Sequence, residues 1–227
     1  MDDHPETPAF QRARSPEAKE QRRRALLDAA SELLRDGGHE AVTLAGIAER
    51  AGVVKSGVYR YFESREEILM RLMASGLEDM AEEMEGLLPE LEGSGDAETV
   101  AARTARAFAA RPDMCELAGV LSTVLEHNVG PETLLEIKRE MLGSARRIAV
   151  AGARMVPAVG AEGWALACRL IFSLVSGHWP LSHPPAQVAE VLAHEDFAPV
   201  RKDFEEDLRL GIAALLRGLA AGDAAPA

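Results

Sequence analysis

The segment from Thr43 to Phe62 constrains the fold more than any other part of the chain. Thr43 belongs to the residue types that cap helix N-termini, and a short apolar-periodic run follows it. Ala51 and Gly52 interrupt that run, since glycine readily adopts the positive φ that a tight turn needs. A second short run extends from about Lys55 to Phe62. Two short helices joined by a glycine-containing turn predict a helix-turn-helix motif, which we place at residues 44–63.

The side chains inside this segment suit such a corner. Ala48 is small at the point where the two helices must cross closely, and Ile47, Val53 and Val58 are positioned to fill the inside of the corner. With its inner face packed in this way, the second helix presents its other face to solvent. A helix presented like that fits the major groove of B-DNA, which is about 12 Å wide.

The rest of the chain predicts helices and no strands. A first helix is expected at about residues 18–35, ended by Gly37 and Gly38. After the motif, Ser64 and Glu67 form a capping-box pattern that opens a helix running to about Leu88. Further helices are expected at about 97–110, 113–128, 132–155, 161–178 and 200–220, separated by prolines and glycines. Because no segment alternates strictly between polar and apolar residues, we predict an all-α fold.

Charge is distributed unevenly along the chain. The net charge is −12, yet residues 11–76 hold 12 lysines and arginines against 10 acidic residues. Residues 77–227 hold 13 basic residues against 24 acidic ones. A mildly basic N-terminal third is therefore joined to an acidic body, which permits nucleic-acid binding by the first part only.

Several functional classes find no support in the sequence. No phosphate-binding loop or dinucleotide fingerprint is present, so we expect no cofactor. Only two cysteines occur, and His178 and His183 lack an evident third ligand, so we expect no metal site. The N-terminus shows no apolar signal segment, and the long uncharged run before Glu190 contains three prolines. We therefore expect a cytoplasmic protein without a membrane span.

The N-terminal third resembles the TetR family of transcriptional regulators over roughly residues 21–81. The resemblance rests on the first helix and on four further groups of residues in a fixed order and spacing. These groups are Thr43 with Ile47-Ala48, Ala51-Gly52-Val53, Val58-Tyr59-Arg60-Tyr61-Phe62, and Ser64-Arg65-Glu66-Glu67-Ile68-Leu69. Three positions depart from the family pattern: Val54 replaces a capping Ser or Thr, Gly57 replaces Ser, Thr or Ala, and Arg65 replaces Lys.

The resemblance implies which side chains contact DNA. The expected set is Thr43, Lys55, Ser56, Gly57, Tyr59, Arg60 and Tyr61. Residue chemistry agrees for Lys55 and Arg60, which supply charge to phosphates and donors to guanine edges. The two tyrosines have an alternative role in packing the corner, and Phe62 is expected in the core. Three arginines of the first helix, at positions 22–24, fit either phosphate contacts or a solvated helix face.

The resemblance also implies a larger C-terminal helical domain that binds an effector and dimerises through its last two long helices. We place a flexible tail at 1–18, the DNA-binding domain at 19–81 and the effector-binding and dimerisation domain at 82–227. The candidate ligand-binding residues are Phe108, Leu121, Leu125, His127, Trp164 and Phe172. His127 has an alternative role, since a histidine also suits a helix C-terminus. The Leu, Met and Ala richness of this part favours a small apolar or amphipathic effector.

Together these observations predict a homodimeric repressor that leaves a palindromic double-stranded DNA operator when an effector binds. Activation in place of repression stays open. Two rival classes also stay open. One is an enzyme that uses Cys115, Glu116, Glu126 and His127, although their spacing matches no catalytic motif. The other is a helical interaction module that does not bind DNA.

Overall fold

The computed structural model describes residues 16–222, and all the regular elements in that range are helical. The α-helices are α1 (Pro16–Ala41), α2 (Leu44–Arg50), α3 (Lys55–Val58), α4 (Arg65–Gly86), α5 (Leu88–Leu91), α6 (Ala97–Ala109), α7 (Pro112–Val120), α8 (Pro131–Met155), α9 (Gly160–Ser182), α10 (Ala186–Leu192) and α11 (Phe204–Gly222). Three short 3₁₀ turns complete them: η1 (Leu125–Asn128), η2 (Pro157–Val159) and η3 (Glu195–Val200). The expected all-α fold is confirmed. Most of the expected N-terminal tail lies outside the described residues, and Pro16–Ala18 already belong to α1.

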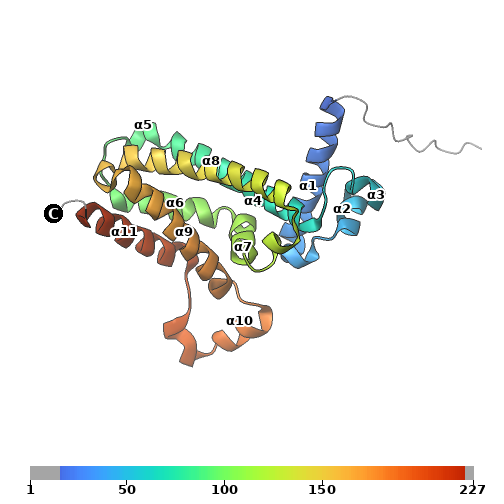
Figure 1. Cartoon of the computed structure of the whole chain (residues 1–227). Helices are drawn as coiled ribbons and strands as arrows, with labels where there is room; N and C mark the ends of the chain where they lie inside the picture. The colour runs from blue at the N-terminus through green and yellow to red at the C-terminus, as the bar shows by residue number, and fades with distance from the viewer. Residues whose placement is uncertain (1–15, 223–227) are drawn as a thin grey trace, which may run out of the picture.

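The first three helices form a small unit at one end of the molecule (Figure 1). Leu26 and Ala30 of α1, Ile47 of α2 and Phe62 after α3 are all buried in its core. Helix α4 begins in this unit and continues into the larger helical body, where it packs along α8. The body is completed by α6, α7, α9 and α11, with α9 in contact with α7, α8 and α11. Helix α4 is therefore the continuous element between the two parts.

Several expected boundaries need correction. Helix α1 continues to Ala41 through a kink at Gly37 and Gly38, where φ of Gly38 is 72°. Helix α3 ends at Val58, short of Phe62, because the backbone N–H groups of Tyr61 and Phe62 both donate to the Val58 carbonyl. That tightening draws the Phe62 ring into the core, where it is 2% exposed.

The helix expected at 113–128 is broken into α7 and the turn η1. At the break the chain turns inward, and Leu125 is fully buried. Helix α9 is longer than expected, and α10 was not expected at all, since a helix of this length after two prolines has little periodic signal.

The expected dimer face of the last helix also needs correction. The apolar face of the last helix includes Leu208 and Ile212, and both are buried inside the single chain, at 2% and 0% exposed. A charge at either position would disrupt the core of one subunit rather than report on an interface. The outward large apolar side chains of the last two long helices are instead Leu170, Leu174 and Leu181 of α9 and Leu210 of α11.

One stretch of the described chain, Pro157–Ser182, is long and apolar enough to span a membrane by length and composition alone. Its most apolar window has a mean hydropathy of 1.5, and 28% of that window is buried within the chain. Trp164, Ile171 and Val175 on this stretch face the core of the body. The inward face therefore serves packing between helices, which leaves the outward face to be explained.

Candidate nucleic-acid interface and ligand cleft

The corner between α2 and α3 has the geometry that the sequence predicts. The side chain of Thr43 caps α2 by accepting a hydrogen bond from the Gly46 N–H at 3.0 Å. Gly52 has a φ of 65°, which permits the turn, and the Val53 N–H donates to the Ala48 carbonyl at 2.8 Å. Ile47 is fully buried beneath this turn. These contacts therefore fix the position of α3 relative to α2.

Helix α3 and the turn after it present a group of polar side chains to solvent. Lys55, Ser56, Tyr59 and Arg60 are all exposed, and Tyr59 is 54% exposed. Within residues 16–222, neither Lys55 nor Arg60 has a carboxylate partner. Val54 at the helix N-cap makes no capping hydrogen bond and is 72% exposed, which agrees with the departure noted in the sequence. The face is thus free to bind an external anionic partner.

The other members of the expected DNA-contact set occupy less open positions. Thr43 is exposed beside the corner, while Gly57 is half-buried against Val53. Tyr61 is half-buried and packs against the core, so its ring is less available than that of Tyr59. The assignment of these residues to DNA contact stays a prediction.

Most nearby arginines already have partners. Arg24 pairs with Glu20 at 3.3 Å, and Arg50 pairs with Asp36 at 2.7 Å. The Arg23 guanidinium lies 5.5 Å from the centroid of the Phe62 ring, within the range of a cation–π contact. These interactions leave Lys55 and Arg60 as the charges of the motif that solvent or a ligand must satisfy.

The start of α4 is held by contacts of the Ser64 hydroxyl and of the Glu67 carboxylate. The Ser64 hydroxyl accepts a hydrogen bond from the Glu67 N–H at 3.1 Å, as the capping pattern predicts. The Glu67 carboxylate accepts from the Glu63 N–H at 2.7 Å and pairs with Arg71 at 2.8 Å. Glu67 is only 4% exposed, and the Arg71 guanidinium and the Glu63 N–H offset the cost of burying its carboxylate. Sequence reasoning found Ser64 and Glu67 and missed the pairing with Arg71.

Two polar contacts join the N-terminal unit to helix α7 of the body. The Glu116 carboxylate accepts from the His39 N–H at 2.5 Å and lies 2.8 Å from the His39 Nδ1. Asp113, one turn earlier on α7, lies 3.9 Å from Arg35 of α1. These residues are far apart in the sequence, so no local pattern reveals the contacts. They make α7 a second connection between the two parts, in addition to α4.

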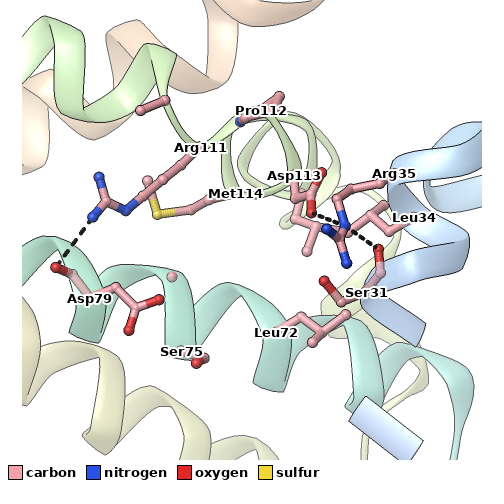
Figure 2. Close-up of a pocket in the computed structure, with 13 residues that line it drawn as sticks. Ser31, Leu34, Arg35, Leu72, Ser75, Asp79, Arg111, Pro112, Asp113 and Met114 are labelled. Atoms are coloured by element: carbon pink, nitrogen blue, oxygen red, sulfur yellow. Dashed lines mark hydrogen bonds and ion pairs between the residues drawn. The ribbon is translucent and has the colours of Figure 1, made fainter. Parts of the chain in front are cut away.

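A cleft of about 370 Å³ lies between α1, α4 and the start of α7 (Figure 2). Its lining consists of Ser31, Leu34, Arg35, Leu72, Ser75, Gly76, Asp79, Ala110, Arg111, Pro112, Asp113, Met114 and Leu117. The cleft therefore touches the N-terminal unit on one side and the body on the other.

The charged groups of this cleft are mostly engaged with their own surroundings. Arg111 pairs with Glu83 at 2.7 Å and donates to the carbonyls of Ala107 and Asp79. Burial raises the pKa of Asp113 above its usual value, although Arg35 opposes the shift. With Leu34, Leu72 and Met114 as apolar walls, the cleft suits a small amphipathic molecule.

The six candidate ligand residues lie outside this cleft. Phe108, Leu121, Leu125 and Trp164 are buried in the body, and Phe172 is half-buried. His127 is exposed, and its ring nitrogen Nε2 lies 3.2 Å from the Ser122 carbonyl. Their role in ligand binding stays a prediction, and the cleft lining is a set that sequence reasoning missed.

The side chains considered for an enzyme are each engaged separately. The buried Cys115 thiol donates to the Phe108 carbonyl at 3.3 Å, and burial raises its pKa to about 12. Glu116 binds His39, and Glu126 pairs with Lys138. A thiol with so high a pKa is a poor nucleophile at neutral pH.

The two histidines near the end of α9 serve contacts around α11. His178 lies 3.1 Å from Asp207, a carboxylate that the sequence did not indicate, and His183 stacks on Trp179. Among the described residues, no group of three or more His, Cys, Asp or Glu side chains is arranged to hold a metal ion.

Two family models together match most of the chain. Residues 26–72 match the model described as bacterial regulatory proteins of the tetR family. Residues 74–223 match the model described as the tetracyclin repressor-like C-terminal domain.

Curated relatives match the N-terminal part. The transcriptional repressor KstR of Rhodococcus jostii is 41% identical over 64 residues, which are 28% of this chain and 30% of that protein. The uncharacterized regulator YfiR of Bacillus subtilis is 35% identical over 63 residues, covering 28% of this chain and 31% of that protein. The match therefore spans about 30% of the length of the first of these relatives.

Solved structures match over nearly the whole chain at low identity. A putative TetR-family regulator from Mesorhizobium loti is 17% identical with a TM-score of 0.52, covering 90% of this chain and 97% of that one. A TetR regulator from Rhodococcus sp. RHA1 is 19% identical with a TM-score of 0.54, covering 87% and 97%. At this identity the likeness shows a shared fold.

Proposed function

Because this chain belongs to the TetR family of bacterial regulatory proteins, we propose that it is a ligand-responsive DNA-binding transcriptional repressor. The observation that carries the proposal is the exposed face of α3, where Lys55 and Arg60 lie beside Ser56 and Tyr59 without acidic partners in the described chain. The proposal gives the protein no catalytic role and places it in the cytoplasm.

On DNA, the two basic side chains have different tasks. Lys55, at the first turn of α3, neutralises a phosphate and positions the helix. Arg60 donates to a base edge in the major groove, as arginine does most often with guanine. In a symmetric dimer, two such helices reach half-sites about 34–36 Å apart, so the operator is palindromic.

Release from DNA is proposed to work through the two connections between the parts. Helix α4 runs from Ser64 into the body, and α7 holds the end of α1 through His39 and Glu116. A small amphipathic effector in the cleft between α1, α4 and α7 would change the spacing of these helices. The reading helices of the dimer would then no longer match the half-site spacing, which weakens binding.

The test is footprinting on DNA that flanks the gene, followed by titration of the protected fragment. We expect a protected palindrome and affinity that falls steeply with salt, because phosphate contacts release counterions. A ligand screen on the same complex then seeks compounds that dissociate it. Binding to the flanking DNA that is no tighter than binding to unrelated DNA of equal length would contradict the proposal and favour an interaction module.

The cleft has its own test. Ser75 is exposed on the α4 side of the cleft, so Ser75→Trp places a large ring in the space that the effector needs. We expect the variant to bind operator normally and to lose its response to the effector. Loss of response in an equally large substitution outside the cleft lining, Glu132→Trp at the start of α8, would argue that the cleft is not the effector site.

A further inference from the structure

The segment from residue 183 to residue 203, here called the arm, stands away from the body between α9 and α11 (Figure 1). Neither α10 nor η3, which make up most of it, contains a buried residue. Large apolar side chains nevertheless point to solvent along it: Val188 is 46% exposed, Val191 55%, Phe197 38% and Val200 53%. The arm thus carries an apolar surface that its own chain does not cover.

The arm is anchored at its base. The Trp179 ring stacks on His183 with centroids 3.6 Å apart and meets Phe204 edge-on at 4.8 Å. Phe204 is 7% exposed, so this aromatic group ties both ends of the arm to the body.

The arm also holds its own shape. The Arg201 guanidinium donates to the carbonyls of Leu192, Ala193 and His194, which closes the chain between α10 and η3. The arm therefore has a defined structure that leaves its large apolar side chains exposed. Exposed apolar surface of this kind marks an interaction site.

The apolar surface of the arm continues onto α9. Leu170, Leu174 and Leu181 lie on one face of that helix by their spacing, and they are 40%, 40% and 61% exposed. Leu210 of α11 adds a fourth exposed side chain, beside Gly211, whose added Cβ would lie 3.4 Å from Leu174. The outward faces of α9 and α11 are the ones through which the proposed dimer associates.

Charge on these surfaces is also complementary. Arg169 on α9 is exposed and donates only to its own helix, at the Ala165 carbonyl. Glu190 on α10 is exposed, and neither residue has an oppositely charged partner within residues 16–222. A second copy of the chain supplies both kinds of partner at once.

We propose that the arm clasps a second copy of this chain, with the apolar face of α10 against the outward face of α9 and α11 of the partner. The contact is reciprocal, because a two-fold dimer buries the same surface on both copies. The inference rests on the dimer of the proposed function and adds the element that holds it. It adds the exposed apolar side chains of the arm to the four exposed leucines of α9 and α11.

The first test is the double variant V188D/V191D, which places charge on α10 without touching the core of the subunit. The dimer dissociation constant measured by analytical ultracentrifugation should rise at least about tenfold, since charged side chains at a dry apolar interface weaken association. The melting temperature at concentrations where both proteins are monomeric should not change. The matched control is L142D/V150D, at two exposed apolar positions of α8.

Three results overturn the proposal, and they differ from one another. An unchanged dissociation constant in V188D/V191D shows that the arm does not hold the dimer, while the dimer itself stands. If the control L142D/V150D raises the dissociation constant as much as V188D/V191D does, the interface lies on α8. A wild-type chain that is monomeric at micromolar concentration removes the dimer, and with it this part of the proposed function.

A second test locates the arm directly. Val191→Cys in a Cys168→Ala background is labelled with a benzophenone maleimide, and isotope-labelled and unlabelled chains are mixed before irradiation. We expect mixed-isotope cross-links from the arm to α9 or α11. Cross-links within one chain only would assign the arm to contacts with its own body. Arm-dependent sedimentation with anionic phospholipid vesicles, without dimer formation, would assign the arm to a lipid surface.

Discussion

At the residue scale, the exposed face of α3 keeps two basic side chains that are unpaired within residues 16–222, because nearby acidic residues pair with other arginines. Arg50 is held by Asp36, and Arg24 by Glu20, so these arginines are engaged within the DNA-binding unit itself. Lys55 and Arg60 are left without acidic neighbours in the described chain. Charges placed in this way attract phosphate without first breaking an internal ion pair.

The two basic residues should respond differently to substitution. Arg60→Ala should cost about 1–3 kcal/mol on the cognate operator and relax specificity at one base pair, because it removes a bidentate hydrogen bond to a base. Lys55→Ala should weaken binding to all sequences and lower the salt slope by about 1, because it leaves one phosphate without its cation. Fluorescence titrations at several salt concentrations measure both effects. Wild-type behaviour of both variants would show that α3 does not read the DNA.

A close approach in the body fixes the identity of another residue. Gly152 on α8 lies directly under the Trp164 ring, and a Cβ built there would lie 2.4 Å from that ring. Trp164 is 1% exposed and its indole N–H donates to the Val156 carbonyl at 3.4 Å, so the ring has little freedom to move. Only a residue without a side chain fits between α8 and α9 here.

Gly152→Ala should therefore destabilise the protein by about 1–3 kcal/mol, the usual cost of overpacking a filled core. The control is Gly143→Ala on the same helix, where an added Cβ meets nothing within 4 Å. That change should raise stability by up to about 1 kcal/mol through helix propensity. Urea unfolding followed by circular dichroism distinguishes the two, and equal effects would mean that the ring moves aside at no cost.

At the element scale, α4 depends on its first turn. Ser64, Glu67 and Arg71 secure this turn where the chain leaves the DNA-binding unit. Because α4 also forms a large part of the body core through Ile68, Met73 and Met80, its N-terminus sets where α3 stands relative to the body. A frayed first turn would therefore loosen the reading helix as well as α4.

Ser64→Ala should lower the free energy of unfolding by about 1 kcal/mol, the typical cost of losing an N-cap. Ser75→Ala, on an exposed position inside the same helix, should leave stability unchanged or slightly raised. Hydrogen exchange should show faster exchange at the first amides of α4 in Ser64→Ala. An undisturbed first turn in that variant would mean that Glu67 alone caps the helix.

At the scale of the whole molecule, regulation requires that the DNA-binding unit and the body move together. Helix α4 joins them covalently, and α7 joins them through Glu116 to His39 and Asp113 to Arg35. The cleft lies between these two connections (Figure 2). A ligand there is in a position to act on both.

Glu116→Ala should weaken the response to effector more than it weakens operator binding, because under the proposed mechanism the contact with His39 transmits movement of α7 to α1. Couplings between ligand sites are typically about 1–3 kcal/mol, or about 5- to 150-fold in affinity, and must be reciprocal. Calorimetry of the effector with and without saturating operator should show a smaller ratio in the variant. Glu90→Ala, which removes the exposed pair with Arg103 in the body, is the control and should keep the wild-type ratio.

The sequence by itself determined the all-α class, the caps at Thr43 and Ser64, and the turn at Gly52. These features depend on neighbours within a few residues, so local pattern carries them. The exposure of the basic side chains of Lys55 and Arg60 was also predicted, because a helix-turn-helix leaves one face of its second helix uncovered.

Only the tertiary structure decided what depends on residues distant in the sequence. It buried Leu208 and Ile212 inside the subunit and left Leu170, Leu174 and Leu210 outside. Periodicity shows that a helix has an apolar face, but it does not say which neighbour covers that face. It was also the packing of the helices that brought Glu116 to His39 and opened the cleft near Asp113. Such contacts arise from how helices pack across the whole chain, which no local spacing records.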